Sequence, residues 1–336
     1  FVVVFVFSEI LTSIFSDNAM VAAIGHDYLS FRILGLPFLA ICLVIRGFWN
    51  GQSSPLRYLK IIVFVHLLNI GLNYILIFGH YGFPVMGVSG AGLASTLALM
   101  VGAMIYLIDC RYFLTFKLKK SHIHDNLPWL AKLSIPIFTQ QTLFASGVAI
   151  FYWILSQIGT DAMAIGAVLV NIVLIAILPG AGIGMATMTL VSESIGMRTF
   201  NNAYKWPFKS LHLSVLIIGS FSIIIFCFPT FILTPFFIDL SILNLAIVPI
   251  RLDAIGVLFE VGAIIFMNAL NGADKTRFVA WTSTSLQWII LLPAAYFIGV
   301  HTPYGINGVW LSYLLFQVGQ FFIFGLFWRF HFKQFI

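Results

Sequence analysis

The amino-acid sequence predicts an all-α protein that crosses a membrane many times. Hydrophobic residues make up 61% of the 336 residues and charged residues only 8%, with a mean hydropathy of +1.04. A soluble domain carries roughly 25% charged residues and could not bury this much apolar surface. Long apolar runs also recur at the length of about 20 residues that a membrane-spanning helix needs. Composition and run length together predict a polytopic helical membrane protein.

Each apolar run predicts one membrane-spanning helix, and polar breaks separate ten of them. The runs cover residues 1–15, 28–49, 58–79, 87–109, 129–157, 162–192, 208–228, 243–269, 278–299 and 306–329. The first run is short, and the chain begins inside it with Phe1 rather than methionine. We therefore expect this sequence to be a piece of a longer protein.

The polar breaks alternate in charge along the chain. One alternate set carries Arg57, Lys60, Arg111, Lys117, Lys119, Lys120, Lys132, Arg198, Lys205, Lys209, Lys275, Arg277, Arg329 and Lys333, and the other carries Asp17, Asp27, His80, Asp161, Asp239 and His301. Because loops rich in Lys and Arg stay in the cytoplasm, the basic breaks and the C-terminus are predicted to be cytoplasmic. The net charge of +6 then reflects topology, and we expect no nucleic-acid partner.

The two halves of the chain resemble each other. The segment "FWNGQSSPLRY" at 48–58 parallels "ALNGADKTRFV" at 269–279, and "GVSGAGLA" at 87–94 parallels "GINGVWLS" at 305–312. Equivalent basic breaks fall on the same side of the membrane, so the repeats are predicted to be parallel. The repeat offset places the start of the first repeat about ninety residues before Phe1. The intact protein is therefore expected to have twelve helices.

A long basic and polar stretch, residues 111–132, separates the two repeats. It predicts an N-terminal lobe over 1–125, holding the equivalents of helices three to six, and a C-terminal lobe over 126–336, holding helices seven to twelve. The three cysteines are scattered without metal-ligand spacing, so we expect neither a disulfide nor a metal site.

Three segments resemble the multidrug and toxic compound extrusion (MATE) family of bacterial type, and the resemblance runs over essentially the whole chain. They are "YLSFRILGLPFLAICLVIRGFWNG" at 28–51, "NIGLNYILIFGHYGFPVMGVSGAGLAST" at 69–96 and "LPGAGIGMATMTLVSESIG" at 178–196. The resemblance implies two six-helix lobes forming a V, with a central cleft that opens alternately to each side. It implies a secondary transporter, not an enzyme, that lets H⁺ or Na⁺ enter as hydrophobic, often cationic compounds leave.

The resemblance also implies a multi-pass monomer in the bacterial inner membrane, with no cofactor besides the coupling ion. Only some of the family's functional residues have counterparts in this sequence. The family's aspartate in the first helix has no counterpart here, because that helix is absent from the sequence. The helix that corresponds to helix seven, residues 136–155, has no carboxylate where eukaryotic-type members place a glutamate.

Two acidic residues lie inside one apolar run, Glu260 in its middle and Asp253 two helical turns earlier. Ionisable groups within a membrane span are costly and are functional by default. A carboxyl group that holds a proton in dry surroundings and releases it when wetted could couple proton flow to lobe movement, and it could bind sodium instead. Some bacterial MATE members carry an acid twelve residues before the loop glycine, here Gly272. We predict Glu260 and Asp253 as ion-coupling or substrate residues. The alternatives are a structural Glu260 that is hydrogen-bonded to a neighbouring helix, and an Asp253 that pairs with an interface arginine.

Other polar and helix-breaking residues form two further sets of candidates. Polar residues expected in the cleft are Gln140, Gln141, Asn171, Asn69 and Asn73, with hydrogen bonding between helices as the alternative. Residues expected to act in gating or helix packing are Arg32, Arg251, Pro136, Pro179 and Gly180. The prolines and the segment "LPGAGIG" at 178–184 predict a kink or a break in their helices.

Two other functions fit the sequence less well. A lipid or lipid-linked oligosaccharide flippase of the same superfamily would need several cations for a pyrophosphate headgroup, whereas these spans offer acids and amides. An intramembrane enzyme would need convergent Asp, His or Cys clusters, and the sequence shows no such spacing. No GxxxxGK[ST] motif is present, which favours an ion gradient as the energy source.

Overall fold

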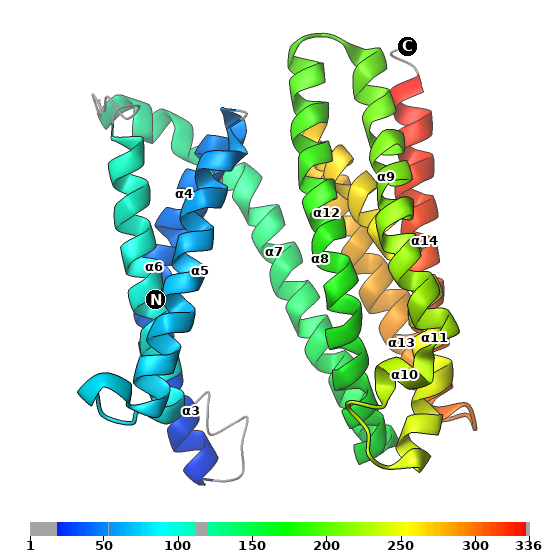
Figure 1. Ribbon diagram of the computed structural model, residues 1–336. Coiled ribbons are helices and arrows are strands. Elements are labelled where there is room, and N and C mark those ends of the chain that lie inside the picture. The colour runs from blue at the N-terminus through cyan, green and yellow to red at the C-terminus, as the bar shows by residue number, and fades with distance from the viewer. Residues whose placement is uncertain (1–18, 53, 112–119, 334–336) are drawn as a thin grey trace. The chain divides into compact units, whose positions relative to one another are not determined.

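The computed structural model describes residues 19–52, 54–111 and 120–333, and every element within these ranges is helical. The first predicted span, 1–15, lies outside the described residues. The chain divides into two compact units, unit 1 over Phe1–Leu118 and unit 2 over Lys119–Ile336 (Figure 1). The sequence predicts the lobe boundary at 125/126, within the stretch 111–132, and in the structure a helix begins inside that stretch at Lys120.

The described residues of unit 1 form a bent helix pair and two long helices. Its elements are α3 (Ala19–Leu34), α4 (Leu36–Gly51), α5 (Pro55–Phe78), the short 3₁₀ turn η1 (His80–Gly82) and α6 (Gly87–Cys110). Helices α3 and α4 are bent by 44° at Gly35, within what the sequence predicted as one span. Gly79 ends α5 in the left-handed region at φ +72°, which glycine adopts without strain.

Helix α6 is the centre of unit 1 and packs against α3, α4 and α5. Its buried face is rich in small residues, including Gly90, Gly92, Ala94, Ala98 and Gly102. A Cβ at Gly90 would lie 2.6 Å from the carbonyl oxygen of Leu76, so only glycine allows this approach of α6 to α5. The glycine of the second repeat behaves in the same way, because a Cβ at Gly308 would lie 2.9 Å from the carbonyl oxygen of Ile298. The Gly-x-x-Gly motif is therefore a packing device in both repeats.

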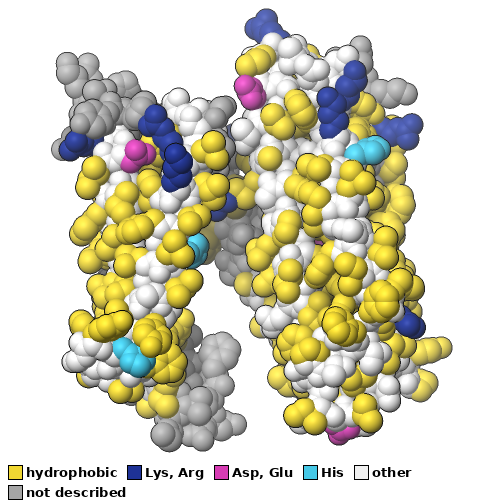
Figure 2. Space-filling view, in the orientation of Figure 1, with side chains coloured by type: hydrophobic (Ala, Val, Ile, Leu, Met, Phe, Trp, Pro, Cys, Tyr) yellow, Lys and Arg dark blue, Asp and Glu magenta, His cyan; other side chains and the backbone are white. Residues whose placement is uncertain are grey.

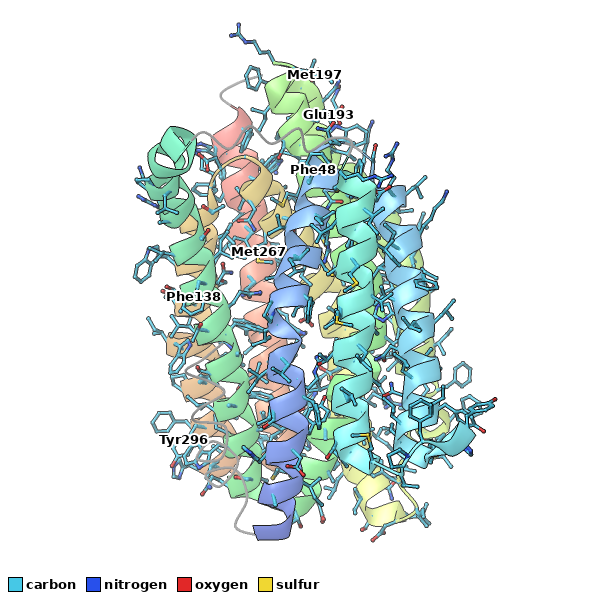
Figure 3. The ribbon with its side chains drawn as sticks, turned by 90° about the vertical axis from the view of Figure 1, so that its left-hand side faces the viewer. Phe48, Phe138, Glu193, Met197, Met267 and Tyr296 are labelled. Carbon is cyan, nitrogen blue, oxygen red and sulfur yellow. The ribbon has the colours of Figure 1, made fainter. Side chains whose placement is uncertain are left out.

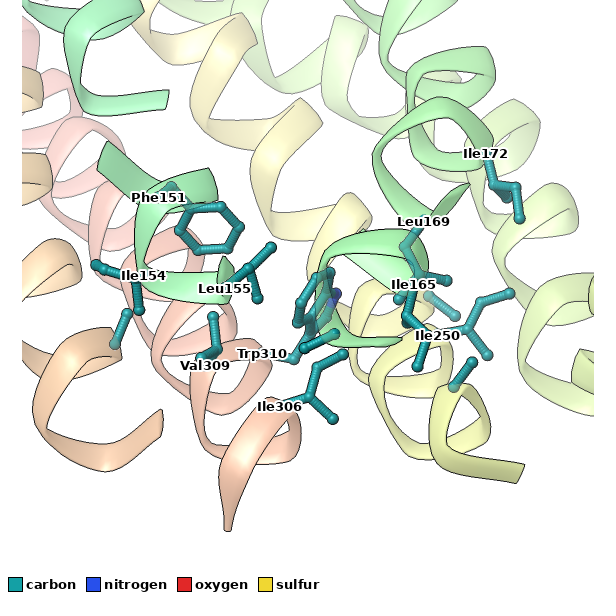
Figure 4. Close-up of a cluster of buried hydrophobic side chains, with 14 of the residues drawn as sticks. Phe151, Ile154, Leu155, Ile165, Leu169, Ile172, Ile250, Ile306, Val309 and Trp310 are labelled. Atoms are coloured by element: carbon teal, nitrogen blue, oxygen red, sulfur yellow. The ribbon is translucent and has the colours of Figure 1, made fainter. Parts of the chain in front are cut away.

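Unit 2 is a bundle built around one long central helix. Its elements are α7 (Lys120–Ile158), α8 (Thr160–Gly196), α9 (Phe200–Cys227), α10 (Pro229–Leu233), α11 (Leu240–Gly272), α12 (Thr276–Ser285), the π-helical turn η2 (Leu286–Leu291), α13 (Leu292–Val300) and α14 (Gly305–Lys333). Helix α11 packs against α8, α9 and α14. Figure 4 shows apolar side chains from α7, α8, α11 and α14 meeting around Trp310.

The helices have the length and surface of membrane spans. Eight helices among the described residues are long and apolar enough to cross a bilayer, and the bent α3–α4 pair makes a ninth candidate. Each corresponds to one of the predicted runs. Hydrophobic side chains cover the visible helix surfaces of each unit, and most visible Lys and Arg side chains of each unit gather toward one end (Figure 2). The prediction of an all-α polytopic membrane protein is confirmed.

Candidate functional site

The two predicted acids lie in the middle third of α11, far from both of its ends. This helix runs without interruption through Pro249 from Leu240 to Gly272. In unit 2, Tyr296 lies toward one end and Met197 at the other, with Met267 of α11 between them (Figure 3). Glu260 precedes Met267 by two helical turns, about 10 Å along the axis, and therefore lies well within the depth of the bundle.

Glu260 is held by two polar side chains from α14. Tyr313 donates a hydrogen bond from its hydroxyl to Oε1 at 3.2 Å, and Gln317 donates one from Nε2 to Oε2 at 2.8 Å. Both carboxylate oxygens thus have a partner, which is what a carboxylate away from bulk water requires. Glu260 as a whole residue is intermediate in exposure and thus less enclosed than the acid one repeat of seven residues earlier.

Asp253 is more deeply enclosed and has a different partner. Its side chain is only 4% exposed, and Trp310 donates a hydrogen bond from Nε1 to Oδ2 at 2.6 Å. The indole of Trp310 packs at the same time against the apolar cluster of Figure 4, with the Phe151 ring 5.9 Å away. Arg251, the arginine of the same helix, does not pair with Asp253: it is exposed, with its guanidinium 5.7 Å from the Phe226 ring.

The contacts between α11 and α14 follow a shared register. Asp253 and Trp310 are 57 residues apart in the chain, and so are Glu260 and Gln317. A step of seven residues along α11 is thus matched by a step of seven residues along α14, as expected for two helices that run side by side in the same direction. Sequence analysis missed the three α14 partners. The seven-residue spacing of Trp310 and Gln317, which equals that of the two acids, was the available signal.

A glycine makes room for the Gln317 amide. Gly256, one turn before Glu260, is buried, and a Cβ there would overlap Oε1 of Gln317. The same Oε1 is buried and has no hydrogen-bond partner among the described residues. The Gln317 amide therefore lies directly against the α11 backbone. Its Nε2 donates to Glu260, and its Oε1 accepts no hydrogen bond from the described residues.

The predicted cleft amides of unit 2 do not join this site. Gln140 donates from Nε2 to Oγ of Ser283 at 3.0 Å and so connects α7 to α12. Asn171 donates to the Ala167 carbonyl of its own helix at 2.7 Å and is exposed, as is Gln141. Two further bonds join α7 to the π-helical turn: Gln287 donates to the Phe144 carbonyl at 3.3 Å, and Trp288 to the Leu143 carbonyl at 3.2 Å.

The predicted amides of unit 1 form a small network of their own. Asn73 donates from Nδ2 to Oδ1 of Asn69 at 3.0 Å, and Asn69 donates from Nδ2 to Oγ of Ser95 at 3.2 Å. The first bond lies within α5, and the second connects α5 to α6. Arg32, in the last turn of α3, is half-buried.

The predicted helix breaks are not present. Helix α8 continues through Pro179, and α7 continues through Pro136. Pro179 is exposed, and an unbroken span of 37 residues includes it. Gly180 instead serves close packing, since a Cβ there would lie 2.6 Å from Val261 of α11. Of the predicted kink or break at "LPGAGIG", the break is absent, because a membrane helix can continue through a proline.

Comparison with known proteins identifies close relatives in sequence. The MatE family model matches residues 1–75 and 136–297. The uncharacterized transporter YisQ of Bacillus subtilis is 30% identical over 288 residues, which cover 83% of this chain and 63% of YisQ. The probable multidrug resistance protein NorM of Thermotoga maritima is 27% identical over 313 residues, which cover 91% of this chain and 67% of that protein. The chain thus spans about two thirds of the length of these relatives.

Solved structures show the same fold. An outward-facing conformation of a multidrug resistance MATE family transporter superposes with a TM-score of 0.84 at 16% identity, covering 99% of this chain and 77% of the other. A transporter of the MOP superfamily from Pyrococcus furiosus superposes with a TM-score of 0.88 at 17% identity, covering 99% and 75%. At 16% and 17% identity, these matches show that the fold is shared.

Proposed function

Because the chain belongs to the MATE family, we propose that the intact protein is an ion-coupled secondary transporter that exports hydrophobic, cationic compounds. The family membership rests on the match over more than half of the chain. The name of the Thermotoga maritima relative, a probable multidrug resistance protein, supports the choice of substrate class. The amides and acids inside the helices suit a cationic cargo better than an anionic headgroup, because carboxylates and carbonyl oxygens attract cations.

One observation carries the proposal: Glu260 is a partly exposed carboxylate in the middle of a membrane span, held by two side chains of a neighbouring helix. Such a carboxylate can bind and release an ion as its surroundings alternate between dry and wet. Asp253 is too enclosed to exchange ions in this way. We assign Asp253 the role of anchoring Trp310, and with it the register between α11 and α14.

The Gln317 amide suits both charge states of Glu260. Its Nε2 donates to the carboxylate when Glu260 is ionised. When Glu260 carries a proton, a half-turn of the amide would present the unused Oε1 to the carboxyl O–H. Tyr313, whose hydroxyl both donates and accepts, can follow the same exchange. In the sodium-coupled alternative, the carboxylate, the Tyr313 oxygen and Oε1 of Gln317 would supply the oxygen ligands.

The proposal includes the setting of the protein in the cell. We propose a multi-pass protein of the bacterial inner membrane with its basic breaks and C-terminus in the cytoplasm, as the distribution of Lys and Arg indicates. The site is built from two helices of a single unit, which supports a protein that works as a monomer.

The experiment that tests the function is transport by the purified intact protein in liposomes. Movement of a fluorescent aromatic cation such as ethidium would be followed under an imposed proton gradient, an imposed sodium gradient, or neither. Transport that depends on one gradient supports the proposal and identifies the coupling ion. Transport that is equally fast without any gradient, or no transport of hydrophobic cations under either gradient, would contradict it.

A further inference from the structure

Two lysines and a histidine in the N-terminal half of α9 form a stripe. Lys205, Lys209 and His212 recur at a spacing of four and three residues, which places them on one face of the helix over about 10 Å. All three are exposed. Together with Phe208 they line a shallow, open hollow on the surface of unit 2.

The two lysines of this stripe have no acidic partner among the residues that the structure describes. Within the part of the chain that the structure describes, neither Lys205 nor Lys209 forms an ion pair, although Glu193 of α8 lies exposed near the same end of unit 2 (Figure 3). The Lys209 ammonium lies 4.9 Å from the centre of the Trp206 ring. Trp206 in turn donates from Nε1 to Oγ of Ser194 on α8 at 3.1 Å, which fixes the ring that supports the lysine.

The same face of α9 turns apolar within one helical turn. Leu216 and Ile223 continue this face along α9 toward its C-terminal end, and they are 73% and 64% exposed. An exposed apolar surface on a membrane protein faces acyl chains, so this part of the face would lie beside hydrocarbon and the lysines nearer the headgroups. Figure 2 shows this pattern on the visible face of unit 2, where cationic side chains gather above a mostly hydrophobic surface.

We propose that this stripe binds one anionic phospholipid from the adjacent leaflet. Its phosphate would lie in the hollow between Lys205 and Lys209, at the level where lipid phosphates occur. His212 donates from Nδ1 to the Phe208 carbonyl at 2.9 Å, which leaves Nε2 for the ester region of the lipid. One acyl chain follows Leu216 and Ile223. Clustered Lys residues beside a membrane span attract anionic headgroups. Each Lys adds about 1 kcal/mol of attraction, which favours anionic over zwitterionic lipids.

The test is lipid binding by the purified intact protein, followed by native mass spectrometry in detergent. Phosphatidylglycerol and phosphatidylcholine of equal chain length are titrated against the wild type and the double variant Lys205→Gln, Lys209→Gln. The matched control is Arg277→Gln, Arg329→Gln, which removes two exposed cations from α12 and α14 at the same end of unit 2. Thermal unfolding of all three proteins shows whether each is folded.

We expect the tightest phosphatidylglycerol site to weaken about fivefold or more in the Lys variant and to change less than about twofold in the Arg control. Phosphatidylcholine binding should be equal in all three proteins. Equal phosphatidylglycerol affinity in the Lys variant and the wild type would overturn the proposal. So would competition by free glycerol phosphate at the affinity of the lipid, because the site would then bind a soluble phosphate. If the double variant does not fold, the single variant Lys209→Gln takes its place, with a smaller loss expected.

Discussion

Gln317 on α14 donates a 2.8 Å hydrogen bond to Oε2 of Glu260 on α11 and lies against the bare backbone of Gly256. This contact joins a partly exposed acid to a fully buried amide. Any change that moves the amide therefore changes the surroundings of the acid, even where the acid itself is untouched.

The first prediction concerns the charge of Glu260. Glu260→Gln in the intact protein should abolish gradient-driven export, with a loss of at least about tenfold, because an amide cannot exchange a proton or neutralise a cation. The Gln side chain has the same shape, so the melting temperature should change little. Glu193→Gln, at the exposed end of α8, is the matched control and should transport normally. Export by Glu260→Gln at the wild-type rate between about pH 6 and pH 8 would remove Glu260 from the mechanism.

The second prediction uses two buried glycines that differ in what surrounds them. Gly256→Ala should displace the Gln317 amide and weaken its bond to Glu260, which costs about 1.5–3 kcal/mol and slows transport roughly tenfold. At Gly219 of α9 the nearest atoms would lie 3.9 Å from a new Cβ, so Gly219→Ala should leave transport and melting temperature unchanged. Equal behaviour of the two variants in the transport assay would show that the amide position is unimportant.

The third prediction separates the two acids. Asp253→Asn keeps an oxygen acceptor for the Trp310 indole, so it should retain both stability and coupled transport. Asp253→Ala leaves Nε1 buried without a partner and should lower the free energy of unfolding by about 1–3 kcal/mol. Denaturation of the purified variants in detergent measures this difference. Loss of coupling in a stable Asp253→Asn protein would instead assign the coupling role to Asp253.

The fourth prediction concerns the orientation in the membrane. Single cysteines at Arg57 and Lys275 should react with an impermeant thiol reagent only from the cytoplasmic side, and one at His301 only from outside. The three native cysteines must first be replaced by serine, because Cys227 is exposed. Labelling of the position 275 cysteine in intact cells would reverse the predicted topology.

The fifth prediction follows from the cap of α11. The backbone N–H of Ser241 donates to Asp239 at 2.8 Å and holds the pKa of that carboxyl below its ordinary value. A lowered pKa means that the cap stabilises the protein fully at neutral pH. This stabilisation is lost as the pH falls below the ordinary aspartate range and through the lower value of the folded protein. The melting temperature of Asp239→Asn should therefore depend less on acid than that of the wild type, and an unchanged dependence would contradict this assignment.

The helices were predictable because membrane spans leave a direct trace in composition and run length. Nine of the ten predicted runs lie within the described residues, and each became a helix or a helix pair. Their ends were less predictable, since polar residues such as Lys120 continue a helix beyond the apolar run. The bend at Gly35 was missed because hydropathy averages over it.

The site was predictable only in part, because sequence shows one helix at a time. Glu260 and Asp253 stand out as acids among apolar residues. Their partners Trp310, Tyr313 and Gln317 look like ordinary interface and packing residues until α14 is known to lie parallel to α11. Sequence also left open whether Pro179 would kink or break its helix, and the structure shows that α8 is not broken there.

The π-helical turn at Leu286–Leu291 accommodates one residue more than regular α-helical winding would hold. Removal of a single residue there could therefore be absorbed by rewinding the turn, where the same deletion in α11 would rotate every later side chain out of its contacts. Such rewinding would move Gln287 and Trp288, whose side chains donate hydrogen bonds to α7 from this widened turn. Variants of this protein that lack one residue in this span should accordingly retain a continuous helix. They should lose the hydrogen bonds from this helix to α7.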